Sequence, residues 1–217
     1  MKSLGVFCGS HAGRGDRYSI AAASFAREVA RRGITVVYGG GRVGLMGVVA
    51  DAALAAGGQV IGVLPRFLEA REVGHSGLTE IHLVDSMHER KAKMAELADA
   101  FVALPGGVGT LEELFEAWTW VLLGVHQKPC GLLSVGNYFD PLIAFLDRSV
   151  EEGFVSPANR AQLRIASDPA VLLAKLSSAG AAANSSGGGA PRASDRRIQG
   201  QVAKASLSVT AGAGVPR

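Results

Sequence analysis

The residues of this chain that could do chemistry follow short apolar segments, in runs rich in glycine. Three such runs are present, at residues 8–16 (CGSHAGRGD), 38–47 (YGGGRVGLMG) and 104–113 (LPGGVGTLEE). Glycine lets the backbone approach a ligand closely, and a helix that starts after such a run offers unpaired N–H groups that suit phosphate. Any one run could also be a sharp turn. Three together favour a phosphate or nucleotide site.

The third run leads into a carboxylate. Thr110 and Glu113 have the spacing of a capping box, in which the two side chains do no more than close the start of a helix. The same position keeps a carboxylate ionised, because the helix dipole favours negative charge there. Since the run holds more glycine than a cap needs, we favour Glu113 as an ionised carboxylate that faces a glycine-lined cleft.

A second capping box, Ser86-x-x-Glu89, is followed directly by Arg90 and Lys91. Cations near a helix start oppose the dipole by about 0.3–1 kcal/mol each. A solvated surface pair would tolerate that cost, and for Lys91 taken by itself we favour this alternative. For Arg90 we favour a ligand role, because the planar guanidinium matches phosphate oxygens.

The second run contains a literal dinucleotide fingerprint at Gly39, Gly41 and Gly44. The fingerprint requires an acidic residue about 20 positions later to hold the ribose. The next apolar segment instead ends in Arg66, which leaves NADP open as a ligand. A dinucleotide oxidoreductase is therefore a minor alternative.

Other sites of chemistry are not indicated. The five histidines lack metal-ligand spacing, and no Gly-x-Ser-x-Gly elbow is present. Cys8 and Cys130 lie in apolar segments, which predicts reduced core cysteines and excludes a disulfide scaffold. The apolar segment 115–123 predicts either a core helix or a helix buried between two subunits.

Short apolar segments alternate with helical ones along residues 1–178. We expect strands at 4–8, 34–38, 59–64, 81–84, 101–104 and 131–135, and helices at 18–32, 45–56, 87–98, 111–123, 141–152 and 169–176. Continuous apolar strands are typical of a parallel sheet covered on both faces. The sequence therefore predicts an α/β fold with a doubly wound parallel sheet, whose ligand lies beyond the carboxyl ends of the strands.

Charge and composition divide the 217 residues into two parts. Residues 1–178 carry 17 basic and 18 acidic residues, and residues 179–217 carry 5 and 1, so the net charge of +3 comes from the second part. That part is rich in Ala, Ser and Gly, and we predict a disordered tail. A near-neutral folded part argues against nucleic-acid binding. No apolar stretch is long enough to span a membrane, and the N-terminus does not read as a signal peptide, so we expect a cytoplasmic protein.

The segments GGGRVGLMG, SMHERK and PGGVGTLEELFEAWTW, in this order, resemble the LOG phosphoribohydrolases, a family formerly labelled lysine decarboxylases. The resemblance covers about residues 2–178. It implies a Rossmann-like fold, a homodimer and hydrolysis of the N-glycosidic bond of N6-modified adenosine 5′-monophosphates, which yields a free cytokinin-type base and ribose 5-phosphate.

The resemblance also implies a site. The catalytic residues would be Arg90 and Glu113, and no metal or redox cofactor is needed. Substrate-binding positions would be Glu72, Arg90, Lys91, Gly107, Val108, Gly109, Thr110, Leu111, Glu112, Glu113 and Thr119. Departure of a purine leaves positive charge on the ribose, which an ionised Glu113 would stabilise. An arginine holds its proton too firmly to be a general acid, so we assign Arg90 to positioning or charge stabilisation.

Two other functions stay open as alternatives, and a third, decarboxylation with pyridoxal phosphate, fails on its chemistry. A molybdenum-cofactor carrier has a similar fold and similar glycine loops but binds without turnover. A DNA-handling Rossmann protein is disfavoured by the near-neutral charge of residues 1–178. A pyridoxal phosphate decarboxylase is disfavoured because none of Lys2, Lys91, Lys93, Lys128 and Lys175 lies in a recognisable setting for a Schiff base.

Overall fold

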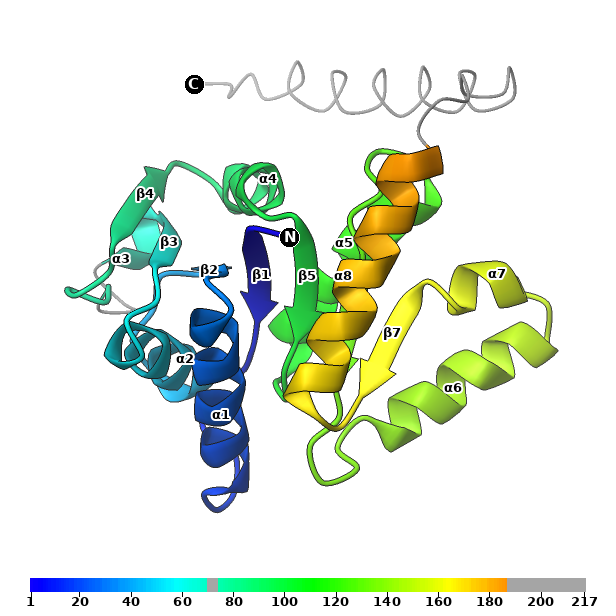
Figure 1. The fold of residues 1–217 in the computed structure, drawn as a ribbon, viewed down its shortest axis with the longest axis horizontal. Coiled ribbons are helices and arrows are strands. Elements are labelled where there is room, and N and C mark those ends of the chain that lie inside the picture. The colour runs from blue at the N-terminus through cyan, green and yellow to red at the C-terminus, as the bar shows by residue number, and fades with distance from the viewer. Residues whose placement is uncertain (70–73, 187–217) are drawn as a thin grey trace, which may run out of the picture. The chain divides into compact units, whose positions relative to one another are not determined.

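The computed structural model of the chain describes residues 1–69 and 74–186, with the side chains described as far as residue 180. Seven parallel strands form one sheet in the order β4-β3-β2-β1-β5-β6-β7 (Figure 1). The strands are β1 (Ser3–Phe7), β2 (Thr35–Tyr38), β3 (Val60–Pro65), β4 (Glu80–Val84), β5 (Ala100–Ala103), β6 (Cys130–Leu133) and β7 (Leu163–Ala166). The predicted α/β class and doubly wound parallel sheet are confirmed.

Helices alternate with the strands along the chain (Figure 1). They are α1 (Arg17–Arg31), α2 (Gly44–Ala55), α3 (Arg66–Glu69), α4 (Met87–Leu97), α5 (Val108–Leu122), α6 (Asp140–Glu151), α7 (Pro157–Arg160) and α8 (Pro169–Ser186). None of the helices in the described part of the chain is both long and apolar enough to cross a membrane.

The sheet separates two apolar layers, which accounts for the continuous apolar strands. On one face the strands pack against α1, α2 and α8, with Phe25, Val49 and Leu172 fully buried. On the other face they pack against α4, α5 and α6, with Met94 and Leu114 in the core. Because successive strand residues point to opposite faces, a strand covered on both sides needs apolar residues at every position.

The strand order reverses beside β1. The chain adds β2, β3 and β4 on one side of β1 and then returns to place β5 on its other side. The carboxyl ends of β1 and β5 therefore diverge into loops that leave in opposite directions, which opens a crevice at this edge. The first and third glycine-rich runs follow these two strands.

Three short elements were not predicted: α3, α7 and β7. Strand β7 lies at the edge of the sheet and includes Arg164, so it lacks the continuous apolar pattern of the central strands. The last helix was predicted to end near Leu176, but α8 continues to Ser186, into the segment predicted to be disordered. Alanine has the highest helix propensity, so a helix already packed through Leu172 and Leu176 extends at little cost. Residues 187–217 of the predicted tail lie outside the described residues.

The core between the sheet and α1 should carry much of the stability. Phe25 is fully buried, and we expect Phe25→Ala to lower the free energy of unfolding by about 3–5 kcal/mol, because it removes apolar contacts and leaves a cavity. Urea denaturation followed by circular dichroism measures the change. Ile20→Ala on the same helix is the control: its side chain is 60% exposed, so the change should stay within about 0.5 kcal/mol. Equal effects of the two variants would contradict the assignment of the buried face.

Candidate functional site

A cleft of about 460 Å³ lies at the carboxyl edge of the sheet, where the strand order reverses. Its walls come from the loop after β1, the start of α2, the loop after β5 with the first turn of α5, and the side chains of α4 that face them. The charged or titratable side chains that line it, among the described residues, include Arg90, Glu112, Glu113 and His11. The cleft therefore lies where ligands generally bind in such folds, beyond the carboxyl ends of the parallel strands.

The three glycine-rich runs meet at this cleft. Gly9 N donates to the Pro105 carbonyl over 3.0 Å, and Leu45 N donates to the Gly9 carbonyl over 2.9 Å. Gly44 packs so closely on the first run that an added Cβ would lie 2.3 Å from the Ser10 carbonyl carbon. Glycine is needed at position 44 for this approach and for its φ of 59°. The three glycine-rich runs thus lie together at the carboxyl edge of the sheet, where the sequence analysis expects the ligand.

The first turn of α5 has backbone N–H groups without partners inside the helix, an arrangement that suits an anion. Its N-cap is Gly107, which has no side chain to cap the helix, and Leu111 N is the first to turn back, onto the Gly107 carbonyl. The N–H groups of Val108, Gly109 and Thr110 therefore have no partner within the helix. A Cβ added at Gly107 or Gly109 would meet no atom within 4 Å, so packing does not require glycine there, and a ligand can come close to the backbone.

The capping box predicted for Thr110 and Glu113 is wrong. The helix begins at Val108, so Thr110 is its third residue and cannot be its N-cap. Its buried hydroxyl instead packs on Gly106, where an added Cβ would lie 2.1 Å from Thr110 Oγ1. The second predicted box exists in a modified form: Ser86 Oγ accepts from Glu89 N, while Glu89 Oε2 accepts from Asp85 N rather than from Ser86.

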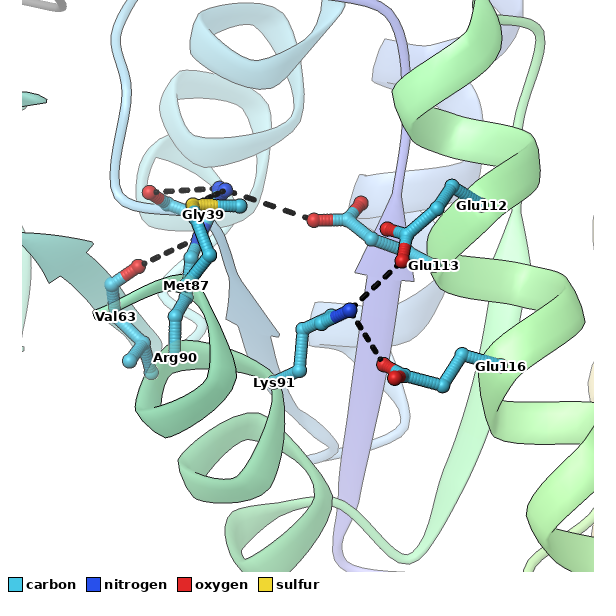
Figure 2. Close-up of polar contacts among 8 residues, drawn as sticks. All are labelled: Gly39, Val63, Met87, Arg90, Lys91, Glu112, Glu113 and Glu116. Carbon is cyan, nitrogen blue, oxygen red and sulfur yellow. Dashed lines mark hydrogen bonds and ion pairs between the residues drawn. The ribbon is translucent and has the colours of Figure 1, made fainter. Parts of the chain in front are cut away.

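Arg90 is a buried charge, with 8% of its surface exposed, on the first turns of α4. Its Nε donates to the Val63 carbonyl over 3.2 Å, and its Nη2 donates to the Gly39 carbonyl over 3.3 Å (Figure 2). The guanidinium is therefore held by the carboxyl ends of β2 and β3. The cost of removing a cation from water is offset by these hydrogen bonds and by a nearby carboxylate.

That carboxylate is Glu113. Its Oε1 lies 3.6 Å from Arg90 Nη1, and Figure 2 shows the two side chains reaching toward each other from α5 and α4. Both line the cleft, so the structure brings together the two residues that the family resemblance implies to be catalytic.

The negative charge of Glu113 also acts on Cys8, which lines the cleft. Burial raises the pKa of its thiol far above the usual range, and the charge of Glu113 raises it further. Cys8 is therefore a neutral thiol and not a nucleophile. Cys8 and Cys130 are both free and buried, as predicted.

Lys91, Leu111 and Thr119 do not line the cleft, although the family resemblance placed them among the binding positions. Lys91 Nζ instead lies 2.7 Å from Glu112 Oε1 and 3.0 Å from Glu116 Oε2. Burial opposes its charge, but the hydrogen bonds and charges of the two carboxylates outweigh this and raise the pKa of Lys91.

The cleft is lined by five of the other binding positions that the family resemblance implies: Gly107, Val108, Gly109, Thr110 and Glu112. Glu72 lies outside the described residues.

Two tyrosines in the cleft were missed. Tyr18 and Tyr138 pack edge to face, with ring centroids 5.6 Å apart, and Tyr138 Oη donates to the Gly106 carbonyl over 2.6 Å. Tyr138 follows the carboxyl end of β6, so the strand-end rule could have indicated it. Tyr18 is the second residue of α1 and lies two residues after the first glycine-rich run.

A metal centre is not indicated by the described side chains. Among residues 1–69 and 74–186, no three histidine, cysteine or acidic residues come together in a way that could hold a metal ion. The cleft offers backbone N–H groups and a guanidinium, which suit an anion.

The fold and the cleft define a Rossmann-like α/β protein with an uncapped helix start and a facing Arg–Glu pair. Residues 46–176 match the family model described as "Possible lysine decarboxylase". A cytokinin riboside 5′-monophosphate phosphoribohydrolase of Rhodococcoides fascians is 52% identical over 168 residues, which cover 77% of this chain and 85% of that protein. One of Arabidopsis thaliana is 50% identical over 160 residues, covering 74% of this chain and 75% of that protein. The chain belongs to this phosphoribohydrolase family.

Solved structures support the fold. The molybdenum cofactor carrier protein of Chlamydomonas reinhardtii superposes with a TM-score of 0.63 over 82% of this chain and 98% of its own, at 22% identity. The molybdenum cofactor binding protein of Rippkaea orientalis gives 0.61 over 81% and 95%, at 23% identity. At this level of identity the likeness concerns the fold and not the site.

The contact between Gly39 and Arg90 can be tested directly. A Cβ added at Gly39 would lie 1.8 Å from Arg90 Nη2, so we expect Gly39→Ala to displace the guanidinium from the Gly39 carbonyl and from Glu113. Overpacking at this point should lower the free energy of unfolding by about 1–3 kcal/mol. A crystal structure of the variant and urea denaturation measure the two effects.

Gly180→Ala on α8 is the matched control. Apart from its chain neighbours and the backbone of its own helix, the atom nearest to the added Cβ would be Pro129 Cγ. The distance of 3.8 Å is an ordinary van der Waals contact. We expect this variant to be as stable as the original protein or slightly more stable, because alanine favours helix. An undisplaced Arg90 in Gly39→Ala would contradict the close fit.

Proposed function

We propose that this protein hydrolyses the N-glycosidic bond of adenosine 5′-monophosphates, N6-modified ones included, and releases the free base and ribose 5-phosphate. One observation carries the proposal: Arg90 and Glu113, 3.6 Å apart, line the same cleft as the uncapped start of α5. The printed names of the relatives at about half identity describe the same activity for those proteins.

The 5′-phosphate would bind at the start of α5. The N–H groups of Val108, Gly109 and Thr110 point along the helix axis, and the positive end of the dipole favours a dianion. Open space at Gly107 and Gly109 lets phosphate oxygens approach the backbone. Binding energy gained here, away from the reacting bond, holds the ribose against Glu113.

Glu113 would act on the sugar. As the bond from C1′ to the purine nitrogen breaks, its electron pair leaves with the base, and positive charge grows on the ribose. A carboxylate beside C1′ stabilises that charge and accepts a proton from the attacking water, whose oxygen forms the new bond to C1′. The departing base takes up one proton, so the products are the neutral base and ribose 5-phosphate.

Arg90 would keep this carboxylate and the sugar in position. Its guanidinium is fixed by the Val63 and Gly39 carbonyls, so it is organised before substrate binds. Tyr138, which is 41% exposed and rests on the buried ring of Tyr18, offers an aromatic ring in the same cleft on which a purine could stack.

Of the binding positions that the family resemblance implies, we propose substrate contact for those that line the cleft. The substrate-contacting set that we propose is Arg90, Gly107, Val108, Gly109, Thr110, Glu112 and Glu113. For Glu72, Leu111 and Thr119, substrate contact stays a proposal based on the sequence.

The description "lysine decarboxylase" fits this cleft poorly. None of the lysines in the described part of the chain lines it, so no amine faces the space where a cofactor aldehyde would have to react. We propose that the protein works without a metal or redox cofactor, because the hydrolysis needs only water and charge stabilisation.

We propose further that the protein is a cytoplasmic homodimer that does not bind nucleic acid. The free thiols of Cys8 and Cys130 fit a reducing compartment. Leu123 and Val125 are exposed at the end of α5, and Phe145 is exposed on α6, so apolar surface is available for a second copy. Sedimentation equilibrium that gives the mass of a single chain at micromolar concentration would overturn the dimer.

The first functional prediction concerns the phosphate. We expect the purified protein to release adenine from AMP, or the modified base from isopentenyladenosine 5′-monophosphate, and to use adenosine with kcat/KM lower by about 100-fold or more, because adenosine lacks the group held by α5. Chromatography of the released base measures both rates. Tight nucleotide binding without release of base would favour a carrier function instead.

The second functional prediction concerns Glu113. We expect Glu113→Gln to lower kcat by about 10²–10³-fold, because the amide cannot stabilise positive charge, while nucleotide affinity measured by calorimetry is retained. Glu96→Gln, on the exposed surface of α4, is the control and should leave kcat unchanged. Turnover by Glu113→Gln at the original rate would show that this carboxylate has no role in the reaction.

A further inference from the structure

Three carboxylates crowd the middle of α5. Glu112, Glu113 and Glu116 lie within five residues, and Glu112 and Glu116 share one side of the helix because they are four residues apart. Like charges at this spacing repel, and each of the three could compete for a neighbouring cation. Two cations approach them from α4, and these are the adjacent residues Arg90 and Lys91 (Figure 2).

The two cations divide the carboxylates between them. Lys91 Nζ contacts Glu112 over 2.7 Å and Glu116 over 3.0 Å, whereas Arg90 Nη1 is paired with Glu113 over 3.6 Å. Lys91 thus makes short, charge-assisted contacts that span from α4 to two positions on α5. The Arg90–Glu113 contact is longer than a hydrogen bond, so it does less to hold the two helices together.

Lys91 is placed between the helices and outside the cleft. It is 13% exposed, and with Glu113 and Glu116 it lines a small gap between α4, α5 and the sheet. The cleft is lined by its neighbour Arg90 but not by Lys91. A cation that is already paired with Glu116, outside the cleft, and with Glu112, at its border, is poorly placed to bind a phosphate within it.

The hydrogen bonds that hold Arg90 make the contact of Lys91 between α4 and α5 important for the position of Glu113. Its Nε and Nη2 bind carbonyls of Val63 and Gly39, which belong to β3 and to the loop after β2, and none of these groups lies on α5. Arg90 is therefore fixed to the sheet independently of the helix that carries Glu113. The distance between the Arg90 guanidinium and the Glu113 carboxylate therefore depends on where α5 lies relative to α4.

We propose that Lys91 is a positioning residue: it ties α5 to α4 through Glu112 and Glu116, and so sets the distance between Arg90 and Glu113. By occupying Glu112 and Glu116 it also keeps these carboxylates from competing for Arg90. The role rests on the proposed hydrolase function, and it differs from the direct substrate contact that the family resemblance implies for this lysine.

The test separates turnover from binding. In Lys91→Met, which keeps the length of the side chain and removes its charge, we expect kcat to fall by about tenfold and KM for AMP to stay within about threefold, since a misplaced catalytic pair costs rate. Glu116→Leu should lower kcat in the same direction, although Glu116 does not line the cleft. The double variant should lose little more than Lys91→Met, because both changes break one link.

Controls come from the same helix. Lys93→Met removes an exposed pair with Glu96 and should leave kcat and KM unchanged, while Lys91→Arg should retain most of kcat because it keeps the charge. A rise in KM of about tenfold or more with kcat unchanged would show that Lys91 contacts substrate and would overturn the proposal. Unchanged kcat and KM in Lys91→Met would overturn it as well.

A second readout needs no turnover and so remains valid if the proposed function fails. In a crystal structure of Lys91→Met we expect the separation between Arg90 Nη1 and Glu113 Oε1 to widen beyond about 4 Å, the usual limit of an ion pair. An unchanged separation would refute the positioning role. Absence of base release by the original protein would refute the hydrolase function alone.

Discussion

The buried charge of Arg90 is the constraint on which the architecture of the cleft depends. A guanidinium removed from water is stable only where acceptors are fixed around it, and here the acceptors come from three separate parts of the chain: the Gly39 carbonyl, the Val63 carbonyl and Glu113. The carboxyl ends of β2 and β3 and the start of α5 must therefore be in place together. The absence of a side chain at Gly39 is part of the same constraint, because a Cβ would occupy the position of Nη2.

The second organising feature is the meeting of three loops at one edge of the sheet. The loops after β1 and β5 bond to each other through Gly9 and Pro105, and the start of α2 bonds to Gly9 through Leu45. Close backbone contact of this kind requires glycine at the points of approach, and Gly44 shows it most clearly. The result is a cleft whose lining includes Gly9, Gly13, Gly106, Gly107 and Gly109, with the positive end of α5 at one wall and the Arg–Glu pair at another.

The comparisons show how fold and function separate in this architecture. Carrier proteins for the molybdenum cofactor share the fold at 22–23% identity. Relatives named phosphoribohydrolases share about half of the residues over most of their length. The helix end that could hold phosphate suits either kind of protein. The charged pair beside it carries the argument for a hydrolase, because binding alone does not require a carboxylate held against a fixed guanidinium.

The sequence by itself determined the α/β class, the places of the central strands and the edge at which the glycine runs meet, because buried parallel strands need continuous apolar residues and tight loops need glycine. It also singled out Arg90 and Glu113. It could not determine β7, whose edge position leaves a mixed pattern, or the true start of α5, which overturned the capping role of Thr110.

Which cation faces which carboxylate was decided by the tertiary structure. Arg90 and Lys91 are adjacent in sequence and carry the same charge, but one side chain is directed toward the strand ends and the other toward Glu112 and Glu116. Successive residues of a helix point about 100° apart, so the packing of α4 on the sheet sends neighbouring side chains into different surroundings. Tyr18 and Tyr138, 120 residues apart along the chain, came together for the same reason: contacts between distant segments exist only once the sheet is assembled.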